Sequence, residues 1–290
     1  MELATLISIV VRASIGLIVF GLALTASPQD ALYLLRRPGQ LGRSLLAMNV
    51  IMPLFAAVLA ALFDLNPAVK IALITLALSP VPPVLPKKQL KAGGRASYAV
   101  GLLVAAALLA IVFVPVAVEL LERAFAISLH VAPAAIARLV FITVLAPLAV
   151  GIIVRRVVPR LAERMAQPIS LVATVLLVVA VLPIVFTAWP AMVSLVGNGT
   201  IVAIVAFSLA GLAAGHLLGG PDPDDRAVLA LATASRHPGV AMAIASANFP
   251  GETLVLAAVL LYLIVSAIVS IPYLTWRRRQ HGGIARAVET

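Results

Sequence analysis

Long apolar runs recur along the chain and are separated by short polar loops. We count nine runs of about twenty residues, each long enough as a helix to cross roughly 30 Å of hydrocarbon. The predicted spans are 4–26, 43–63, 68–86, 97–120, 131–154, 167–189, 199–218, 227–247 and 252–275. Backbone groups inside lipid must be hydrogen-bonded to one another, and only helices and closed barrels achieve this. Barrel strands are alternating segments of about ten residues, so these continuously apolar runs are expected to be helices. The pattern predicts an all-α polytopic membrane protein with about nine transmembrane helices.

Composition agrees with this class of protein. Hydrophobic residues make up 63% of the 290 residues, charged residues make up 11%, and the mean hydropathy is +1.15. The first run has no basic start and is about twenty residues long, so we expect a retained membrane helix and not a signal peptide. The chain has no cysteine, which excludes disulfides and thiolate metal sites. We expect one transmembrane domain, residues 1–276, followed by a basic cytoplasmic tail, residues 277–290.

The net charge of +10 suggests nucleic-acid binding at first sight, but the placement of the basic residues indicates membrane topology instead. When loops are assigned alternately to the two sides, 16 of the 21 basic residues fall on one side. They are Arg36, Arg37, Arg43, Lys87, Lys88, Lys91, Arg95, Arg155, Arg156, Arg160, Arg164, Arg226, Arg277, Arg278, Arg279 and Arg286. The positive-inside rule makes that side cytoplasmic. We expect a multi-pass protein of the cell inner membrane, with its amino terminus outside, its carboxyl terminus in the cytoplasm and no nucleic-acid partner.

Two spans contain residues that interrupt a helix. The third carries several prolines in close succession, each of which removes an amide donor, and the eighth carries a Pro-Gly pair directly after two ionisable residues. The expected break residues are Pro80, Pro82, Pro83, Pro86, Pro238 and Gly239. We predict discontinuous helices at about 68–93 and 227–247, with second half-helices that begin near Lys87 and Val240. Single prolines elsewhere are expected to be plain kinks; they are Pro53, Pro115, Pro147, Pro183 and Pro272.

The two broken spans are related by position. They are the third and the eighth, five apart, so they cross the membrane in opposite directions. Inverted repeats have this relation, and their paired interrupted helices meet at the substrate site. The offset predicts five-helix repeats, with one helix missing from the first.

Several short stretches resemble the bile acid:sodium symporter family and its bacterial relatives. They are residues 20–25 (FGLALT), 37–38 (RP), 49–53 (NVIMP), 79–80 (SP) and 233–241 in the eighth span. The resemblance follows nearly the whole chain in order and spacing. It implies a panel domain and a core domain, the latter with two crossed discontinuous helices, and it implies secondary transport. Some members have nine spans with the amino terminus outside, as predicted here.

The chain departs from the family pattern at both breaks. Symporters of this family carry Glu-Thr-Gly-x-Gln-Asn in the second broken helix, and its glutamate helps to bind Na⁺; here Arg236 stands at that position. The first broken helix usually reads Pro-Gly-Gly followed by Ser-Asn, whereas residues 80–86 read PVPPVLP. Asn49, where relatives often have glutamine, keeps a suitable oxygen. The resemblance therefore implies that both Na⁺ sites are absent.

The acidic residues lead to the same expectation independently. All eleven carboxylates fall in loops, termini or span ends, so none is available to neutralise Arg236 near the bilayer midplane. A buried guanidinium repels Na⁺ and binds a carboxylate bidentately. Alternatively, Arg236 hydrogen-bonds backbone carbonyls that the helix breaks leave free. The expected substrate-binding residues are Arg236, His237, Asn49, Lys87, Lys88 and Ser79, and no metal ligand or cofactor is predicted.

Other polar groups have two interpretations each. His237 either titrates and couples protons to transport or is a satisfied buried histidine. Ser79 either lines a polar path or bonds its own helix, whereas the amide of Asn49 needs partners in hydrocarbon. The turn before the eighth span is expected to be solvated and cytoplasmic; it contains Asp222, Asp224, Asp225 and Arg226.

These patterns favour a secondary transporter that carries a small organic anion by alternating access, independent of Na⁺ and either facilitative or proton-linked. One alternative is a sodium-coupled organic anion symporter with a relocated cation site. Another is a membrane sensor or scaffold derived from a transporter. An enzyme is not expected, because the chain has no Gly-x-Ser-x-Gly motif and no paired carboxylates at mid-span.

Overall fold

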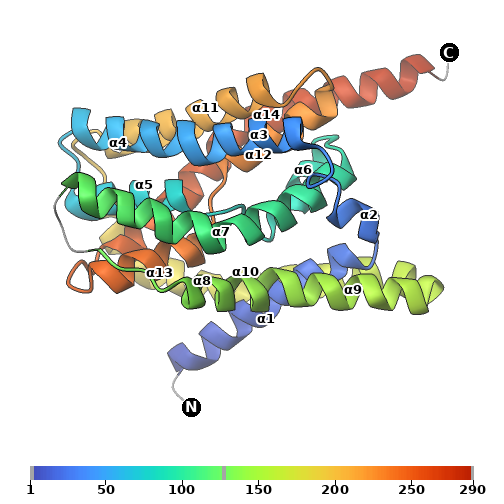
Figure 1. The fold of residues 1–290 in the computed structure, drawn as a ribbon. Coiled ribbons are helices and arrows are strands. Elements are labelled where there is room, and N and C mark those ends of the chain that lie inside the picture. The colour runs from blue at the N-terminus through green and yellow to red at the C-terminus, as the bar shows by residue number, and fades with distance from the viewer. Residues whose placement is uncertain (1–2, 126–128, 289–290) are drawn as a thin grey trace.

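The computed structural model describes residues 3–125 and 129–288, which form helices and no strands (Figure 1). The helices are α1 (Leu3–Ala23), α2 (Pro28–Ala31), α3 (Pro38–Leu45), η1 (Leu46–Ile51), α4 (Met52–Leu62), α5 (Pro67–Leu78), α6 (Leu85–Lys91), α7 (Ala96–Phe125), α8 (Pro133–Val140), η2 (Phe141–Leu145), α9 (Ala146–Val157), α10 (Pro159–Ser194), α11 (Thr200–Leu218), α12 (Pro223–Ala234), α13 (Pro238–Asn248) and α14 (Val255–Val288). The segments η1 and η2 are π-helical.

The predicted polytopic architecture is confirmed. Eight segments of the described chain are long and apolar enough to span a membrane, and α5 is a shorter apolar helix of 12 residues that continues through a break into α6. The helix α14 runs on to Val288 and so includes most of the residues expected to form a tail.

The isolated prolines have two kinds of surroundings. The helices α7, α10 and α14 continue through Pro115, Pro183 and Pro272. Pro53 and Pro147 are each the second residue of the α-helix that follows a π-helical segment, η1 and η2. A missing amide is tolerated at both kinds of site, and in the second kind the backbone responds by widening its hydrogen-bond pattern.

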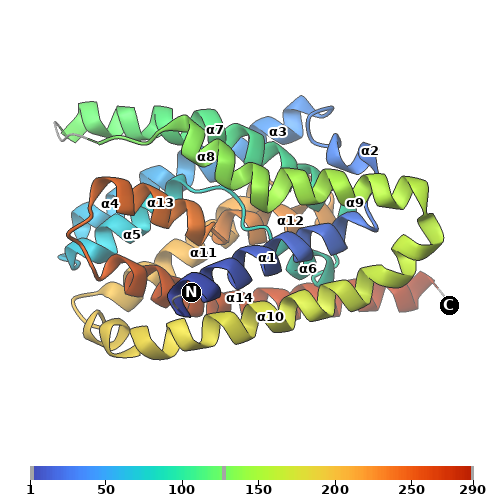
Figure 2. The ribbon, with the colours of Figure 1, turned by 90° about the horizontal axis from the view of Figure 1, so that it is seen from below.

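The helices separate into two groups, as Figures 1 and 2 show. The panel group consists of α1, α8, η2, α9 and α10, and the core group contains the other helices. In the panel group, α1 packs between α9 and α10 at two close approaches (Figure 2). A Cβ at Gly21 would lie 2.4 Å from Ser170 Oγ of α10, and one at Gly151 of α9 would lie 2.4 Å from Ala23 Cβ. The groups touch where α7 meets α8 and where α10 meets α14.

In the core group, the two broken helices cross each other. The half-helix α5 packs on α13, and α6 packs on α12. Between α6 and α12, the buried side chain of Gln89 donates from Nε2 to the Val228 carbonyl at 2.8 Å. Each half of one broken helix therefore contacts the opposite half of the other, so the two breaks lie at the crossing point. This is the crossed arrangement that the family resemblance implies.

Glycines hold α12 close to α11. Gly211 and Gly215 of α11 and Gly219 at its C-cap follow each other at four-residue intervals and face α12. A Cβ at Gly215 would lie 2.4 Å from the Leu229 carbonyl oxygen and 2.5 Å from Ala230 Cα. Small residues at this spacing let two membrane helices approach backbone to backbone. The position of α12, and of the break at its end, is fixed by this contact.

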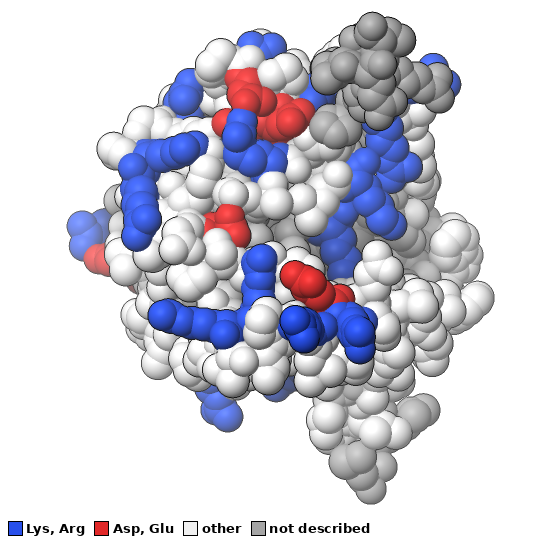
Figure 3. All heavy atoms as spheres, turned by 90° about the vertical axis from the view of Figure 1, so that its right-hand side faces the viewer, with Lys and Arg blue, Asp and Glu red and all other residues white. Residues whose placement is uncertain are grey.

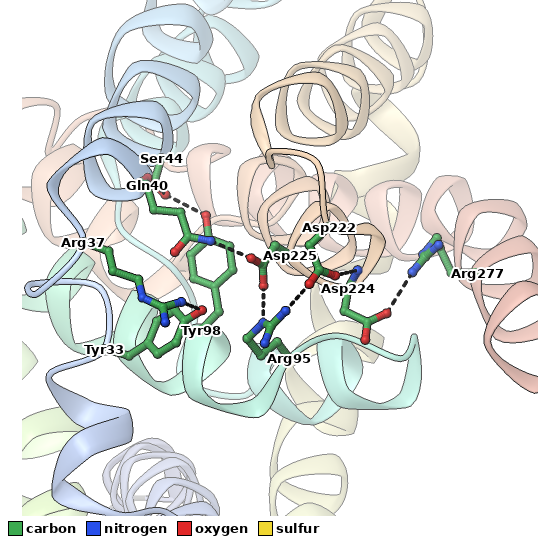
Figure 4. Close-up of polar contacts among 10 residues, drawn as sticks. All are labelled: Tyr33, Arg37, Gln40, Ser44, Arg95, Tyr98, Asp222, Asp224, Asp225 and Arg277. Atoms are coloured by element: carbon green, nitrogen blue, oxygen red, sulfur yellow. Dashed lines mark hydrogen bonds and ion pairs between the residues drawn. The ribbon is translucent and has the colours of Figure 1, made fainter. Parts of the chain in front are cut away.

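Basic residues gather at one end of the bundle, which we call the basic end (Figure 3). There Asp225, which is 6% exposed, accepts hydrogen bonds from Arg95 Nε at 2.7 Å and from Gln40 Nε2 at 2.6 Å (Figure 4). Arg95 also pairs with Asp222, the N-cap of α12. The hydrogen bond to Asp225 and the charges of both carboxylates raise the pKa of Arg95.

The prediction of a wholly solvated turn at residues 222–226 is therefore wrong for Asp225. Its carboxylate joins α3 and the start of α7 to the start of α12, and two donors compensate for its burial. Beside it, Arg277 of α14 donates from Nη2 to Asp224 at 3.3 Å (Figure 4). The basic end thus joins four helices of the core group through charged side chains.

Candidate functional site

The first break separates α5 from α6. Residues 79–84 form no helix, and α6 begins at Leu85, slightly before the predicted start near Lys87. Pro80, Pro82 and Pro83 lie in this gap and are buried, whereas Pro86 is the second residue of α6. Proline suits that position because an amide in the first turn of a helix has no intrahelical partner.

The second break is shorter. The helix α12 ends at Ala234 and α13 begins at Pro238, so Pro238 and Gly239 start the second half-helix and do not lie within the gap. The phenol of Tyr262 on α14 donates to the Ala234 carbonyl at 2.8 Å and so satisfies one acceptor at the end of α12. Near the break, Gly239 is exposed and Ser235 and Pro238 are partly exposed.

Arg236 lies in the second break and is 1% exposed. Its Nη1 donates to the Ser79 carbonyl in the first break at 3.3 Å, and its Nη2 donates to the Met48 carbonyl in η1 at 3.0 Å. The free carbonyl of Met48 has a local cause. In an i→i+5 pattern its partner would be the amide of residue 53, and Pro53 has none. The guanidinium therefore joins three irregular segments of the core group.

The charge of Arg236 has no acidic partner among residues 3–125 and 129–288, because the ion pairs of this part involve other residues. Its Nε is buried and has no hydrogen-bond partner there. In the same described part, no group of His, Asp and Glu side chains could hold a metal ion. A guanidinium has five N–H donors, so the two contacts leave donors available for an acceptor.

His237 caps α13 and is 3% exposed. Its Nδ1 accepts the backbone N–H groups of Gly239 at 3.1 Å and Val240 at 3.4 Å. Its own backbone N–H donates to the Pro80 carbonyl and to Ser79 Oγ, both at 3.0 Å. The ring nitrogen Nε2 is buried and has no partner among the described residues.

Ser79 connects the two breaks. Its hydroxyl donates to the Leu76 carbonyl at 2.7 Å and accepts the amide of His237, while its carbonyl accepts Arg236. Both polar groups of this buried residue are therefore used in the crossing of the broken helices. In this conformation Ser79 positions Arg236 and His237.

The other expected site residues lie around this crossing. Lys87 donates from Nζ to the Ser170 carbonyl at 2.9 Å and to Thr174 Oγ1 at 3.1 Å, so it joins α6 to α10 of the panel group. Lys88 is half-buried and forms no hydrogen bond or ion pair with the described chain. Asn49 lies in η1, next to Met48; it is partly exposed, and its side chain bonds to none of the described residues.

An apolar cavity of about 310 Å³ lies further along the same half-helices. Its lining includes Leu78 at the end of α5, Val118 of α7 and Ile244 of α13. Ile244 is six residues beyond Pro238, roughly 9 Å along a helix axis. The cavity is therefore close to the break on the side away from α6 and α12.

The sequence did not indicate two residues of this site, Met48 and Tyr262. Met48 provides the backbone carbonyl that accepts Arg236 Nη2, and the hydroxyl of Tyr262 donates to the Ala234 carbonyl. The only sequence signal for Met48 is Pro53, five residues later.

The sequence profile described as the Sodium Bile acid symporter family matches residues 13–189, from α1 to within α10. The match includes the first broken helix, Asn49 and Ser79, and it ends before α12 and α13. A comparison with curated protein sequences finds no match.

Proposed function

We propose that this chain, which belongs to the sodium bile acid symporter family, carries a small organic anion across the membrane by alternating access and without coupled Na⁺. Membership of this family makes it a membrane transporter of a small molecule. The anion, the independence from Na⁺ and the role of Arg236 are the parts that we propose.

The observation that carries the proposal is the unneutralised guanidinium of Arg236 at the crossing of the broken helices. A charge at this depth costs several kcal/mol or more unless it has a partner. Two carbonyls stabilise the guanidinium by hydrogen bonds but do not cancel its charge. A carboxylate would cancel it and would accept the N–H groups that remain unused.

The same contacts support transport without Na⁺. Backbone carbonyls freed at helix breaks are suitable ligands for Na⁺ in transporters of this kind. Here the carbonyls of Ser79 and Met48 already accept hydrogen bonds from Arg236. A cation at this position would compete for these oxygens and would be repelled by the guanidinium at short range.

The surroundings favour an anion with an apolar body. The cavity beside the break is lined mostly by aliphatic side chains of α5, α7 and α13. A ligand whose carboxylate reaches the break could place hydrocarbon there and gain roughly 25 cal/mol per Å² of buried apolar surface. A steroid acid, a keto acid and a pantoate-like acid all have the required charge, and they differ in how much apolar surface they would bury.

Thermal-shift screening of the purified protein against these organic acids, with and without Na⁺, tests the proposal. We expect an acid to raise the midpoint of unfolding equally in both conditions. Loss of a charge-assisted hydrogen bond costs about 1.5 to 3 kcal/mol, so Arg236→Gln should lower affinity by tenfold or more. Arg236→Lys keeps the charge without the planar fork and should retain part of the affinity. Arg156→Gln, at an exposed arginine, is the control.

Uptake into proteoliposomes separates the remaining possibilities. Uptake of the acid that binds should not change when a Na⁺ gradient is imposed. Uptake that requires the gradient would indicate a symporter with a relocated cation site. Binding without uptake would indicate a sensor or scaffold. Wild-type affinity in Arg236→Gln would refute the role of Arg236.

A further inference from the structure

His237 has a ring orientation that its contacts determine. Its Nδ1 accepts two backbone N–H groups at the start of α13, from Gly239 and Val240. An imidazole nitrogen that accepts hydrogen bonds carries no hydrogen, so the ring hydrogen of neutral His237 is on Nε2. A Cβ at Gly239 would lie 3.1 Å from Cε1 of the ring, and the glycine therefore leaves room for this cap.

The Nε2–H group is consequently a donor without an acceptor. It is buried, and the described residues offer it no partner. In imidazole the two nitrogens point in widely different directions, so Nε2 faces away from the helix that Nδ1 caps. The neighbouring Arg236 has an unpartnered donor of its own, Nε. Buried polar groups are rarely left without partners, so two adjacent ones indicate a missing acceptor.

We infer that His237 is a second ligand-binding residue, whose Nε2–H donates to one oxygen of a carboxylate while Arg236 binds the carboxylate's charge. This inference rests on the proposed function and adds to it a second residue that binds the carboxylate. The unpartnered groups of Arg236 and His237 are both donors, so a primary carboxamide is disfavoured for two reasons. It lacks the charge, and its amino group faces another donor.

The cap makes His237 a rigid donor. The ring cannot turn without losing the two hydrogen bonds to Nδ1. The backbone that carries the ring is held separately, because its N–H donates to Pro80 and Ser79 of the first break. Protonation of Nδ1 would place a third N–H group against the two amides of the cap. His237 therefore serves as a neutral, oriented donor, and the interpretation of it as the carrier of a coupled proton is disfavoured.

Two substitutions separate the cap from the donor. In His237→Asn the side-chain oxygen can replace Nδ1 as the N-cap, but the Nε2–H is lost. In His237→Gln the amide nitrogen can replace Nε2, but the cap is lost. We expect His237→Asn to keep the unliganded midpoint of unfolding and to bind carboxylates about tenfold more weakly. We expect His237→Gln to lower the midpoint and to keep more of the affinity.

The probes are cholate, pyruvate and pantoate, together with the primary amide of each acid that binds. Wild-type protein should prefer an acid to its amide by at least about tenfold, and the preference should narrow in His237→Asn. An unchanged preference with unchanged affinity in His237→Asn would overturn the inference while leaving the proposed function intact. Failure of the wild type to bind any of the acids would contradict both.

Nitrogen NMR provides a test that needs no ligand. The chain has four histidines, so the signals absent from ¹⁵N-histidine spectra of His237→Asn identify His237. We expect the shifts of a neutral ring with hydrogen on Nε2 and none on Nδ1. A hydrogen on Nδ1 would contradict the inference.

Discussion

At the scale of single residues, two adjacent lysines of α6 have different surroundings. Lys87 donates to Ser170 and Thr174 on α10, whereas Lys88 has no partner in the described chain. Because the ammonium group of Lys87 is already engaged, we expect Lys87→Met to change the affinity for the bound acid by less than about twofold. Lys88→Met should weaken it about two- to fivefold, the range of a partly screened charge. Titration calorimetry on both variants measures the difference.

The thermal stability of the two lysine variants provides a control. Lys87→Met removes a contact between the core and panel groups, so the free energy of unfolding should fall by about 1 kcal/mol and the midpoint of unfolding should fall with it. Lys88→Met should leave the midpoint close to that of the wild type. A tenfold loss of affinity in Lys87→Met would instead indicate that Lys87 contacts the bound acid.

Asp30, at the basic end, makes the stability of the protein depend on pH. It completes the capping box of α2, whose N-cap is Ser27, by accepting the Ser27 amide at 2.8 Å and the Ser27 hydroxyl at 2.7 Å. Burial raises the pKa of Asp30, but hydrogen bonds from Ser97 and Ser27 and the charge of Arg155 outweigh it, so the pKa is lowered. The ionised carboxylate therefore stabilises the fold at a pH above the pKa of the unfolded chain, which is about 3.9. This stabilisation is lost as the pH falls through the lower pKa of the folded protein.

We therefore expect Asp30→Asn to be less stable than the wild type at pH 7, by at most about 1 kcal/mol because the residue is only partly buried. The difference should shrink as the pH is lowered below about 4. Thermal unfolding of both proteins between pH 7 and pH 3 measures it. A difference that stays constant over this range would mean that the charge of Asp30 contributes nothing.

At the crossing of the broken helices, the sequence predicts the burial of Arg236 better than the contacts that it makes. The depth of Arg236 follows from its place in an apolar run, and the absence of a carboxylate partner follows from where the acids fall. Its actual partners do not follow, because the Met48 carbonyl comes from a segment 188 residues away and is free only in the register of η1. The sequence predicts that Lys87 contacts substrate. It does not predict the hydrogen bond from Lys87 to α10, because that bond depends on how the two groups of helices pack.

At the scale of secondary-structure elements, the contact of α11 with α12 positions the second break. Gly215 lies against the backbone of Leu229 and Ala230, where no side chain can move aside. We expect Gly215→Val to destabilise the protein by about 3 kcal/mol or more and to lower ligand affinity, because Arg236 follows directly after the end of α12 in the second break. Gly39→Val is the matched control, since a Cβ at Gly39 meets nothing within 4 Å. Thermal unfolding and ligand titration measure both effects.

A Gly215→Val variant with wild-type stability would show that α11 and α12 can separate without cost. The four-residue spacing of the glycines is visible in the sequence, but it does not identify the partner helix. The breaks themselves are predictable, because several prolines in close succession, or a Pro-Gly pair, remove more helical stability than a single proline does, wherever the segment packs. Single prolines, by contrast, lie inside α7, α10 and α14 without ending them. The π-helical segments are not predictable, since a single proline fits a plain kink equally well.

At the scale of the whole molecule, the two ends of the bundle differ in charge. Arginine and lysine side chains gather at the basic end (Figure 3), and the start of α3 lies on this side of the bundle (Figure 1). The turn between α13 and α14 lies at the opposite end (Figure 1). The alternation of loops that the sequence predicts is thus present in three dimensions. Because membranes retain basic loops on the cytoplasmic side, we expect the basic end to face the cytoplasm and the amino terminus to face outward.

The absence of cysteine from the wild-type chain makes this orientation testable without background labelling. Gly39 at the basic end and Gly251 at the opposite end are both exposed, and a Cβ at either position meets nothing within 4 Å, so a cysteine fits both without strain. In right-side-out membrane vesicles, an impermeant maleimide should label Gly251→Cys and spare Gly39→Cys. Detergent should expose both. The reverse pattern would invert the topology, and it would place the basic loops on the side that the membrane's charge asymmetry disfavours.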